Sequence, residues 1–473
     1  MVGDGRRMKV AFVSSEVVPF AKTGGLADVC GALPLALEAQ KVPTIIILPY
    51  YKEVELKKYK VEEIEKSVLR VGIGNNISVY FVKANKYFNR VGIYGTAQGD
   101  YPDNLERYKY FCEKSISIIK KHEKDVTIIH CHDWQASFIP ILLKKTYTDD
   151  KDLVKVKCVL TIHNLAFQGI FTKQQFKAFG FDKLSFKAEE FEFYGRMNLL
   201  KAGIINSDVV TTVSAQYAKE IQTVDLGCGL ESVLKQKKTK PTGIVNGIDT
   251  SIWNPASDKH LLVKYGKDKY TQGKLKHKQY LQKKCNLTVD PNIPLFGSVG
   301  RIAHQKGVDL ITEAIIQFDE ENVQFIVQGL GDKEMLDGLK RLTRRMKGKV
   351  ALVAEFDEQL AHRIYAGSDF FLMPSRFEPC GLSQMISMSY GALPIVTNTG
   401  GLADTVINYD ELKGNGFVLS TPSTDALVER IEEAMVVFSK KTKLKKLIKN
   451  AFSADFSWKK SAKHYKNIYT CLS

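Results

Sequence analysis

The sequence predicts an α/β protein with two doubly wound domains, each built on a parallel sheet. Short apolar runs rich in β-branched residues recur without polar alternation, which is typical of strands buried on both faces. Each run precedes a stretch of helical periodicity, and strands that alternate with helices form parallel sheets from βαβ units. A turn-rich seam divides the runs into two series, so we expect two domains with a cleft between them.

The predicted strands can be taken in chain order. The first series comprises Val10–Val13, Thr44–Leu48, Thr127–His130, Cys158–Ile162, Val209–Val213 and Gly243–Val245. The second comprises Leu295–Val299, Val323–Val327, Val350–Val353, Phe370–Met373 and Leu393–Thr397. Asn246-Gly247 and Asn254-Pro255 are turn signals at the seam. We therefore predict domains over 1–245 and 246–456, and an amphipathic helix outside the second sheet over 457–473.

Length and charge agree with this organisation. The 473 residues are enough for two or three domains at roughly 150 residues each. The chain carries 68 Lys and Arg against 52 Asp and Glu, a net charge of +16, which favours phosphate-bearing or polyanionic partners. Most lysines are scattered, however, and the densest run, Lys440 to Lys449, has no interleaved aromatic residues and reads as the solvent face of a helix. We expect no nucleic-acid partner.

Cysteine usage and hydropathy indicate the compartment. The eight cysteines form no CxxC pair, so neither a zinc knuckle nor a thioredoxin motif is supported, and a reducing compartment is the simplest interpretation. No stretch approaches the roughly 18 apolar residues of a membrane span. The residues before Lys9 do not resemble a signal peptide. We expect a cytoplasmic protein without a membrane partner.

Two Gly-Gly loops are candidates for anion binding. Thr23-Gly24-Gly25-Leu26 follows the first predicted strand and opens a helix, with Lys22 beside it. Such a loop presents free backbone N–H groups and the positive end of a helix. The spacing fits neither a Walker A loop nor GxGxxG. Thr399-Gly400-Gly401-Leu402 repeats the pattern in the second half. A βα turn without a ligand is the plain alternative for either loop.

The second half also supplies charged groups at strand ends. Arg301 and Lys306 follow one strand, and this close together they could hold a diphosphate and stabilise charge on a leaving phosphate. Glu378 follows another strand and could orient a substrate or balance transition-state charge. The alternatives are surface cations and a carboxylate that caps a helix. Cys380 has no base beside it in sequence and reads as a packed residue.

Histidines and an aspartate end two strands of the first half. His130-Cys131-His132-Asp133-Trp134 ends one and His163 ends the next. A metal site is conceivable, but no HExxH or Cys/His pairing supports it, and recognition of sugar hydroxyls suits strand-end positions better. Asp150-Lys151-Asp152 matches the Asp-x-Asp pattern of metal-dependent sugar transferases, yet its charged surroundings read as a solvated loop. We predict no metal site.

Together these motifs resemble bacterial glycogen synthases and plant starch synthases. They occur in order as Lys22-Thr23-Gly24-Gly25-Leu26, His132-Asp133-Trp134, His163-Asn164-Leu165, Asn246-Gly247-Ile248-Asp249, Arg301 with Gln305-Lys306-Gly307, Arg376-Phe377-Glu378-Pro379-Cys380-Gly381-Leu382, Thr399-Gly400-Gly401-Leu402-Ala403-Asp404 and Asp455-Phe456-Ser457-Trp458. The resemblance extends from about Lys9 to Tyr469. Gln135 and His277 stand where several relatives carry other residues, at positions to which we assign no chemistry.

The resemblance implies a fold and a reaction. The fold would be GT-B, two Rossmann-like domains facing a deep cleft, with the C-terminal helix crossing back to the first domain. The reaction would be retaining transfer of glucose to the nonreducing-end 4-hydroxyl of an α-1,4-glucan primer, without a metal or other cofactor. The family's usual donor is ADP-glucose, although UDP-glucose is used by some members, and no residue of this sequence decides between them.

The resemblance also implies roles for individual residues. Those around the transferred glucose and the leaving group, predicted as catalytic, are Glu378, His163, Asp133, Arg301 and Lys306. Those that bind the donor are Lys22, Gly24, Gly25, Asn246, Arg301, Lys306, Tyr365, Cys380, Gly381, Leu382, Thr399, Gly400 and Gly401, with Tyr365 beside the nucleotide base. Those on the acceptor side are Glu16, Tyr94 and Trp134.

Three other interpretations remain open from the sequence. A related GT-B enzyme, such as a sucrose synthase or a glycan phosphorylase, would share the architecture, although no lysine lies in a recognisable pyridoxal phosphate context. A noncatalytic glucan-binding paralogue is disfavoured because Lys22, Arg301, Lys306 and Glu378 are all present. A nicotinamide dehydrogenase rests on Rossmann architecture alone, which does not determine function.

Overall fold

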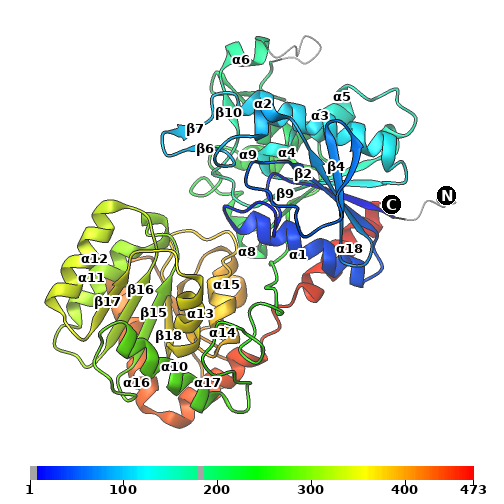
Figure 1. Ribbon diagram of the computed structural model, residues 1–473. Coiled ribbons are helices and arrows are strands. Elements are labelled where there is room, and N and C mark those ends of the chain that lie inside the picture. Colours follow the sequence, from blue (N-terminus) through cyan, green and yellow to red (C-terminus); the bar gives the residue numbers. More distant parts are fainter. Residues whose placement is uncertain (1–7, 179–185, 473) are drawn as a thin grey trace. The chain divides into compact units, whose positions relative to one another are not determined.

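The computed structural model describes residues 8–178 and 186–472, which form two compact units (Figure 1). Unit 1 comprises the chain up to Gly247 together with the segment from Trp458 onward, and unit 2 is Ile248–Ser457. Each unit is a mainly parallel α/β sheet with helices around it. The predicted fold class, two doubly wound α/β domains, is confirmed.

Unit 1 is built around a nine-stranded sheet with the order β14-β13-β9-β8-β1-β2-β5-β4-β3. Its strands are β1 (Val10–Val13), β2 (Thr44–Pro49), β3 (Glu62–Glu65), β4 (Val68–Ile73), β5 (Ile77–Val82), β8 (Ile128–His132), β9 (Lys157–Ile162), β13 (Val209–Thr212) and β14 (Thr242–Gly243). Small antiparallel sheets join β6 (Gly95–Thr96) to β7 (Gly99–Asp100), and β10 (Ile170–Phe171) and β11 (Glu192–Phe193) to β12 (Arg196–Asn198).

The strand order of unit 1 reverses between β1 and β8. From β1 the chain builds outward through β2 and β5, and later from β8 through β9, β13 and β14. Such a reversal is a topological switch point, where ligands of open α/β sheets bind beyond the carboxyl ends of the strands. The residues that follow β1 and β8 are therefore the first place to look for a site in unit 1.

The helices of unit 1 include one from the far end of the chain. They are α1 (Gly25–Ala39), α2 (Asn85–Phe88), α3 (Asn104–His122), α4 (Asp133–Ala136), α5 (Phe138–Lys145), η1 (Leu153–Lys155), α6 (Lys173–Ala178), α7 (Leu199–Asn206), α8 (Ala215–Glu220), α9 (Glu231–Gln236) and α18 (Trp458–Leu472). Helix α18 packs against α1, and the hydroxyl of Tyr469 lies 2.8 Å from Nδ1 of His130 on β8. The C-terminal segment is thus part of the unit 1 core.

Unit 2 contains an entirely parallel six-stranded sheet with the order β17-β16-β15-β18-β19-β20. The strands are β15 (Leu295–Val299), β16 (Gln324–Gln328), β17 (Val350–Val353), β18 (Phe370–Met373), β19 (Leu393–Thr397) and β20 (Phe417–Leu419). The chain runs outward from β15 to β17 and then returns to β18 on the other side of β15. The switch point of this sheet therefore lies between β15 and β18.

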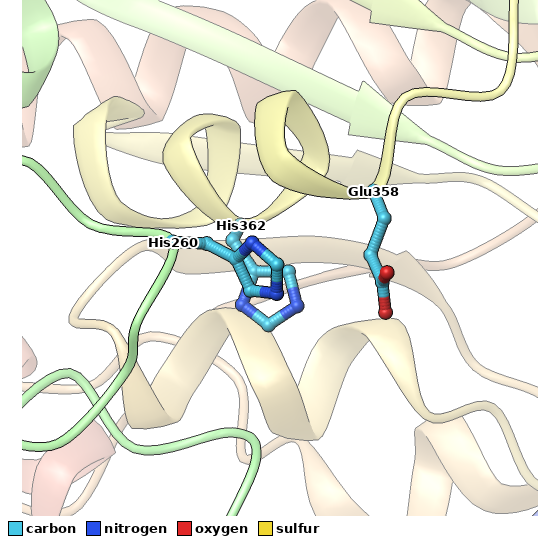
Figure 2. Close-up of side chains that lie close together, drawn as sticks. All are labelled: His260, Glu358 and His362. Atoms are coloured by element: carbon cyan, nitrogen blue, oxygen red, sulfur yellow. The ribbon is translucent and has the colours of Figure 1, made fainter. Parts of the chain in front are cut away.

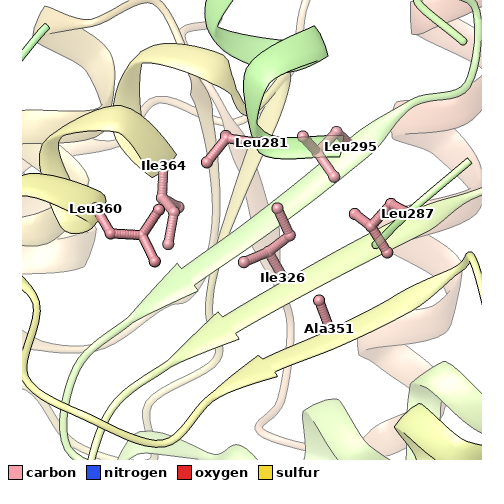
Figure 3. Close-up of a cluster of buried hydrophobic side chains, with 7 residues drawn as sticks. All are labelled: Leu281, Leu287, Leu295, Ile326, Ala351, Leu360 and Ile364. Carbon is pink, nitrogen blue, oxygen red and sulfur yellow. The ribbon is translucent and has the colours of Figure 1, made fainter. Parts of the chain in front are cut away.

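The core of unit 2 packs helices onto this sheet. Leu281 of α10 (Tyr270–Lys284) and Ile364 of α13 (Glu358–Gly367) lie over Leu295 and Ile326 of β15 and β16 (Figure 3). The remaining helices are η2 (His304–Lys306), α11 (Val308–Gln317), α12 (Lys333–Arg345), α14 (Ser383–Ser389), α15 (Gly400–Thr405), α16 (Thr424–Ser439) and α17 (Lys441–Ser453). In α17 the apolar residues face inward and the lysines outward, as the sequence predicts.

Some strands could not be recognised from apolar runs. Strand β5 is parallel to β2, but β4 and β3 continue the sheet antiparallel from it. These edge strands mix polar and apolar residues because their burial is incomplete, so they lack the continuous apolar run of a central strand. The predicted Val323–Val327 is shifted by one residue, to Gln324–Gln328. Within the described ranges, no helix is long and apolar enough to cross a bilayer.

Candidate functional site

Three loops of unit 2 leave the carboxyl ends of neighbouring strands and pack on one another. They follow β15, β18 and β19, the strands around the switch point. The amide of Arg376 donates to the Gln305 carbonyl at 2.9 Å, and Gln305 Nε2 donates to the Phe377 carbonyl at 3.2 Å. The Gly401 amide donates to the Glu378 carbonyl at 3.2 Å. These backbone contacts hold together the segments that carry the predicted site residues of unit 2.

Within these loops a cation and a carboxylate are paired. Lys306 Nζ donates to Oε2 of Glu378 at 2.5 Å, and the Ser375 hydroxyl donates to the same oxygen at 3.2 Å. The Glu378 side chain is 9% exposed and the Lys306 side chain 25% exposed. Arg301 is exposed and donates to Gln305 Oε1 at 3.3 Å. The predicted Arg301, Lys306 and Glu378 therefore belong to one connected group.

Glycines allow the loops to approach this closely. Gly400 has φ +43°, and a Cβ there would lie 1.9 Å from the Glu378 carbonyl oxygen. A Cβ at Gly401 would lie 2.1 Å from the carbonyl oxygen of Cys380, and one at Gly307 would lie 2.2 Å from that of Pro374. Only glycine fits such contacts without moving backbone. Gly400 and Gly401 open α15 with its positive end beside the Glu378 loop, which is where an anion is stabilised.

A cavity of about 210 Å³ adjoins these loops. Its walls include Gly300, Arg301 and Lys306 after β15, Ser375 after β18, and Ser383 at the start of α14. Tyr365 lies behind it, 3% exposed, stacked on Phe371 with ring centroids 4.9 Å apart. A separate cavity of about 670 Å³ along β17 contains none of the predicted site residues.

The other residues of unit 2 that are predicted to bind the nucleotide-sugar donor differ in exposure. Cys380 is 5% exposed and Thr399 is likewise buried, whereas Gly381 and Leu382 are partly exposed. Gly381 has φ +74°. The structure thus brings the segments around Glu378 and Gly400 together at one sheet edge.

In unit 1 the Gly-Gly loop already holds a carboxylate. Glu16, which follows β1, is 3% exposed. It accepts hydrogen bonds from the Thr23 amide, from the Gly24 amide at 3.1 Å and from the Tyr94 hydroxyl at 2.6 Å. Gly25 is exposed, and Lys22 pairs with Asp28 at 2.7 Å. Glu16, predicted on the acceptor side, and Gly24, predicted on the donor side, are therefore bonded to each other, and an anion reaching the Gly24 amide would displace Glu16.

Asp133 follows β8 in a strained backbone conformation. Its φ is +56°, which is uncommon for a residue other than glycine and often marks a functional position. Its carboxylate accepts the His163 amide at 2.7 Å. Burial raises the pKa of Asp133 to about 7, because the hydrogen bond from the His163 amide only partly offsets the loss of solvation. The β8 and β9 loops thus meet at one carboxyl group that is close to half protonated near neutral pH.

The strand-end histidines form a buried, neutral ladder. His132 Nδ1 lies 3.0 Å from His163 Nε2, and His130 Nε2 lies 2.6 Å from the Thr161 hydroxyl. Burial lowers the pKa of His130 and of His163 to about 3. His163 is 9% exposed, so it can present a neutral ring atom to a ligand as acceptor or donor.

Two further predicted residues of unit 1 are more enclosed than expected. Trp134 is 8% exposed, with Tyr108 edge-on at 5.1 Å between ring centroids, and a Cβ at Gly169 would lie 2.6 Å from its ring. Asn246 is 6% exposed, and its side-chain oxygen is buried with no hydrogen-bond partner among the described residues. A ligand that donates a hydrogen bond to this acceptor would satisfy it.

The sequence did not reveal several supporting residues. Ser375 and Gln305 hold the Glu378 loop, Thr23 donates to Glu16 at 2.6 Å through its hydroxyl, and His132 bonds to His163. Each lies within a motif already singled out, but polar residues in a loop carry no periodicity that identifies their partners. Asp150 forms a loop as predicted, since it accepts the Leu153 amide at 3.1 Å and pairs with Lys120 at 2.5 Å.

Comparison with known proteins places these residues in a family. Residues 9–236 match the family model of the starch synthase catalytic domain, and residues 282–453 match that of glycosyl transferases group 1. A glycogen synthase of Geotalea uraniireducens is 41% identical over 98% of this chain and 98% of its own length. Glycogen synthase 2 of Geobacter sulfurreducens is 40% identical with the same coverage.

Solved structures give the same result. The catalytic domain of starch synthase IV from Arabidopsis thaliana, bound to ADP and acarbose, superposes with a TM-score of 0.88 at 33% identity, covering 98% of this chain and 99% of that one. A sucrose-phosphate synthase from Thermosynechococcus elongatus, at 17% identity and a TM-score of 0.63, shares the fold alone. The chain is a glycosyltransferase with the GT-B fold that belongs to the glycogen and starch synthase family.

Proposed function

We propose that this protein transfers glucose from ADP-glucose to the nonreducing-end 4-hydroxyl of an α-1,4-glucan and releases ADP. The configuration at the anomeric carbon is retained, and the transfer needs no divalent metal. The observation that carries the proposal is the connected group formed by Arg301, Lys306 and Glu378 at the carboxyl ends of neighbouring strands. The starch synthase IV structure bound to ADP supports ADP as the nucleotide.

The cations act on the leaving group. A departing diphosphate develops negative charge at its bridging oxygen, and preorganised donors aimed there lower the barrier. Lys306 and Arg301 provide two such cations, and the start of α15 at Gly400 adds favourable helix-dipole potential. The pair of Lys306 with Glu378 holds the ammonium in place before the donor binds. Lys22 and the Gly25 amide of unit 1 are further contacts for the diphosphate in this proposal.

The side chains of Glu378, Asp133 and Asn246 act on the transferred glucose in this proposal. An oxocarbenium-like glucosyl centre is stabilised by nearby negative potential, which Glu378 or ionised Asp133 supplies. His163 and the unpaired oxygen of Asn246 bind glucose hydroxyls, and Glu16, Tyr94 and Trp134 serve the acceptor glucan. The sequence motifs identify no same-face nucleophile, so in this proposal the acceptor hydroxyl attacks from the face that the diphosphate leaves. Isolation of a covalent glucosyl-enzyme would contradict this step.

The direct test is incorporation of labelled glucose into glycogen from ADP-glucose and from UDP-glucose, each with EDTA present. Incorporation from ADP-glucose in EDTA, with only α-1,4 linkages in the product by NMR, is the expected result. Incorporation from UDP-glucose alone would contradict the proposal that ADP-glucose is the sugar donor. Loss of activity in EDTA that returns with Mg²⁺ would overturn metal independence. Failure with both donors, on folded protein that binds glycogen, would favour a noncatalytic glucan-binding protein.

A further inference from the structure

Three possible metal ligands converge in unit 2 outside the residues discussed above. Side-chain ligand atoms of His260, Glu358 and His362 all lie within 4.8 Å of one another (Figure 2). Glu358 and His362 are four residues apart in α13, so they occupy the same face of the helix. His260 comes from the loop that precedes α10. Two imidazoles and a carboxylate are a common ligand set for zinc.

The orientation of His362 is fixed by a buried carboxylate. His362 Nδ1 lies 2.7 Å from Oδ2 of Asp258, and the Tyr390 hydroxyl donates to the same oxygen at 2.5 Å. With Oδ2 of Asp258 as the acceptor, Nδ1 of His362 donates in this contact, and in that tautomer the lone pair lies on Nε2.

That lone pair points into the cluster without a partner. The His362 side chain is 0% exposed, and its Nε2 has no hydrogen-bond partner among the described residues. The indole of Trp253 stacks on the ring with centroids 4.0 Å apart at 13°, so the ring cannot turn away. A buried acceptor with nothing to bind is unfavourable, and a cation is the group that a neutral imidazole nitrogen binds best.

The same aspartate places the second histidine. The His260 amide donates to Oδ1 of Asp258 at 2.8 Å, and the His260 carbonyl accepts from Arg363 Nε at 3.0 Å. The two imidazole rings lie with centroids 4.5 Å apart. A carboxylate that hydrogen-bonds a ligand histidine and fixes its free nitrogen is the usual support of a metal-binding histidine. Glu358 is exposed and free to adjust its rotamer toward the two nitrogens.

We propose that His260, Glu358 and His362 bind one divalent transition-metal ion, with Asp258 as the supporting carboxylate. Zn²⁺ fits best, because it takes imidazole and carboxylate ligands tetrahedrally and leaves the fourth position for water. Its bonds of about 2.0–2.2 Å place ligand atoms roughly 3.3 Å apart, so the exposed Glu358 moves inward on binding. The ion ties α13 to the Asp258–His260 segment. The site is separate from the residues proposed for the transfer reaction.

The test uses the full chain, stripped with a chelator and dialysed. Zn²⁺ titrated by calorimetry should bind at one equivalent, and Co²⁺ should give the intense visible absorption of a tetrahedral site. Saturating Zn²⁺ should raise the unfolding temperature, since an ion that binds only the folded state stabilises it. His260→Ala and Glu358→Gln should each weaken Zn²⁺ binding at least tenfold and abolish the tetrahedral spectrum. His362→Ala is not the primary variant, because it removes a fully buried side chain.

Two controls make the result specific. His464→Ala removes an exposed histidine of α18 outside the cluster and should leave Zn²⁺ binding unchanged. Cys228 and Cys471 are exposed thiols, so the titration is repeated on the Cys228→Ser, Cys471→Ser double variant, which should still bind. No stoichiometric binding by the parent, equal affinity in His260→Ala, or loss of binding only in the cysteine variant would each overturn the proposal. None of these outcomes bears on glucose transfer, which is assayed separately.

Discussion

The ammonium of Lys306 lies 2.5 Å from a carboxylate oxygen of Glu378, although 72 residues separate them in the chain. Lys306 follows β15 and Glu378 follows β18, the two strands that flank the switch point of the unit 2 sheet. The pair sits where the topology of an open α/β sheet concentrates ligand binding. Each side chain also compensates the charge of the other. Removing either one therefore leaves the remaining charge without its partner.

Lys306→Ala should lower kcat/KM for the nucleotide sugar roughly 100–1000-fold, the usual loss for a donor that stabilises a transition-state anion. Glu378→Gln should also lower kcat/KM strongly. The double variant should lose much less kcat/KM than the product of the two single losses, because both side chains act through one pair. Steady-state kinetics of all four proteins gives the coupling. Strictly multiplicative losses would mean that the two side chains act independently.

Gly400→Ala should reduce activity roughly 10–100-fold, since small displacements of substrate-positioning groups have effects of this size. The added Cβ would meet the Glu378 carbonyl oxygen at 1.9 Å, and φ of +43° disfavours alanine. Gly266→Ala is the matched control in the same unit, with nothing within 4 Å of its Cβ. Equal activity of the two variants would refute the idea that close packing of the loops sets the site.

The raised pKa of Asp133 predicts a pH dependence of stability. In the unfolded chain the carboxyl ionises near pH 3.9, whereas in folded unit 1 its pKa is about 7. Between these values the folded state keeps a proton that the unfolded state releases, so this group's contribution to the free energy of unfolding falls as pH rises. Below about pH 4 and above pH 7 the contribution is constant.

Asp133→Asn removes this titration. The difference in unfolding temperature between variant and parent should therefore shift in favour of the variant as pH is raised from 4 to 8, as measured by scanning calorimetry. Asp268→Asn, at an exposed position of unit 2, is the control and should show no such trend. A difference independent of pH in the Asp133 variant would show that the carboxyl titrates normally.

Tyr469→Phe tests the attachment of α18. The variant loses the hydroxyl that lies 2.8 Å from His130 Nδ1 in a fully buried setting, so we expect a loss of about 0.5–1.5 kcal/mol. Tyr469→Ala should lose about 3–5 kcal/mol by leaving a cavity. Urea unfolding monitored by fluorescence measures both, and Lys463→Ala on the exposed face of α18 should have almost no effect.

The fold class and most central strands could be predicted because each strand has a continuous apolar run, such as Val10–Val13 and Phe370–Met373, which are buried on both faces. The edge strand β3 lacks that pattern, and the apolar run of β20 is only three residues long. At the site, the motifs located Arg301, Lys306 and Glu378, but the bond between Glu16 and the Gly24 amide could not be foreseen. The start of a helix stabilises any nearby anion, and the sequence does not show whether that anion is a bound ligand or a side chain of the protein.

Unit 1 is completed by a segment that is synthesised after the whole of unit 2, and this has a consequence for folding on the ribosome. Unit 2 is continuous in sequence and can fold as soon as Ile248–Ser457 has emerged. Until α18 emerges, the face of α1 and the edge of His130 that it covers stay open to solvent. The nascent first unit therefore leaves the surface that α18 covers exposed, and it reaches its final stability only when this last helix docks.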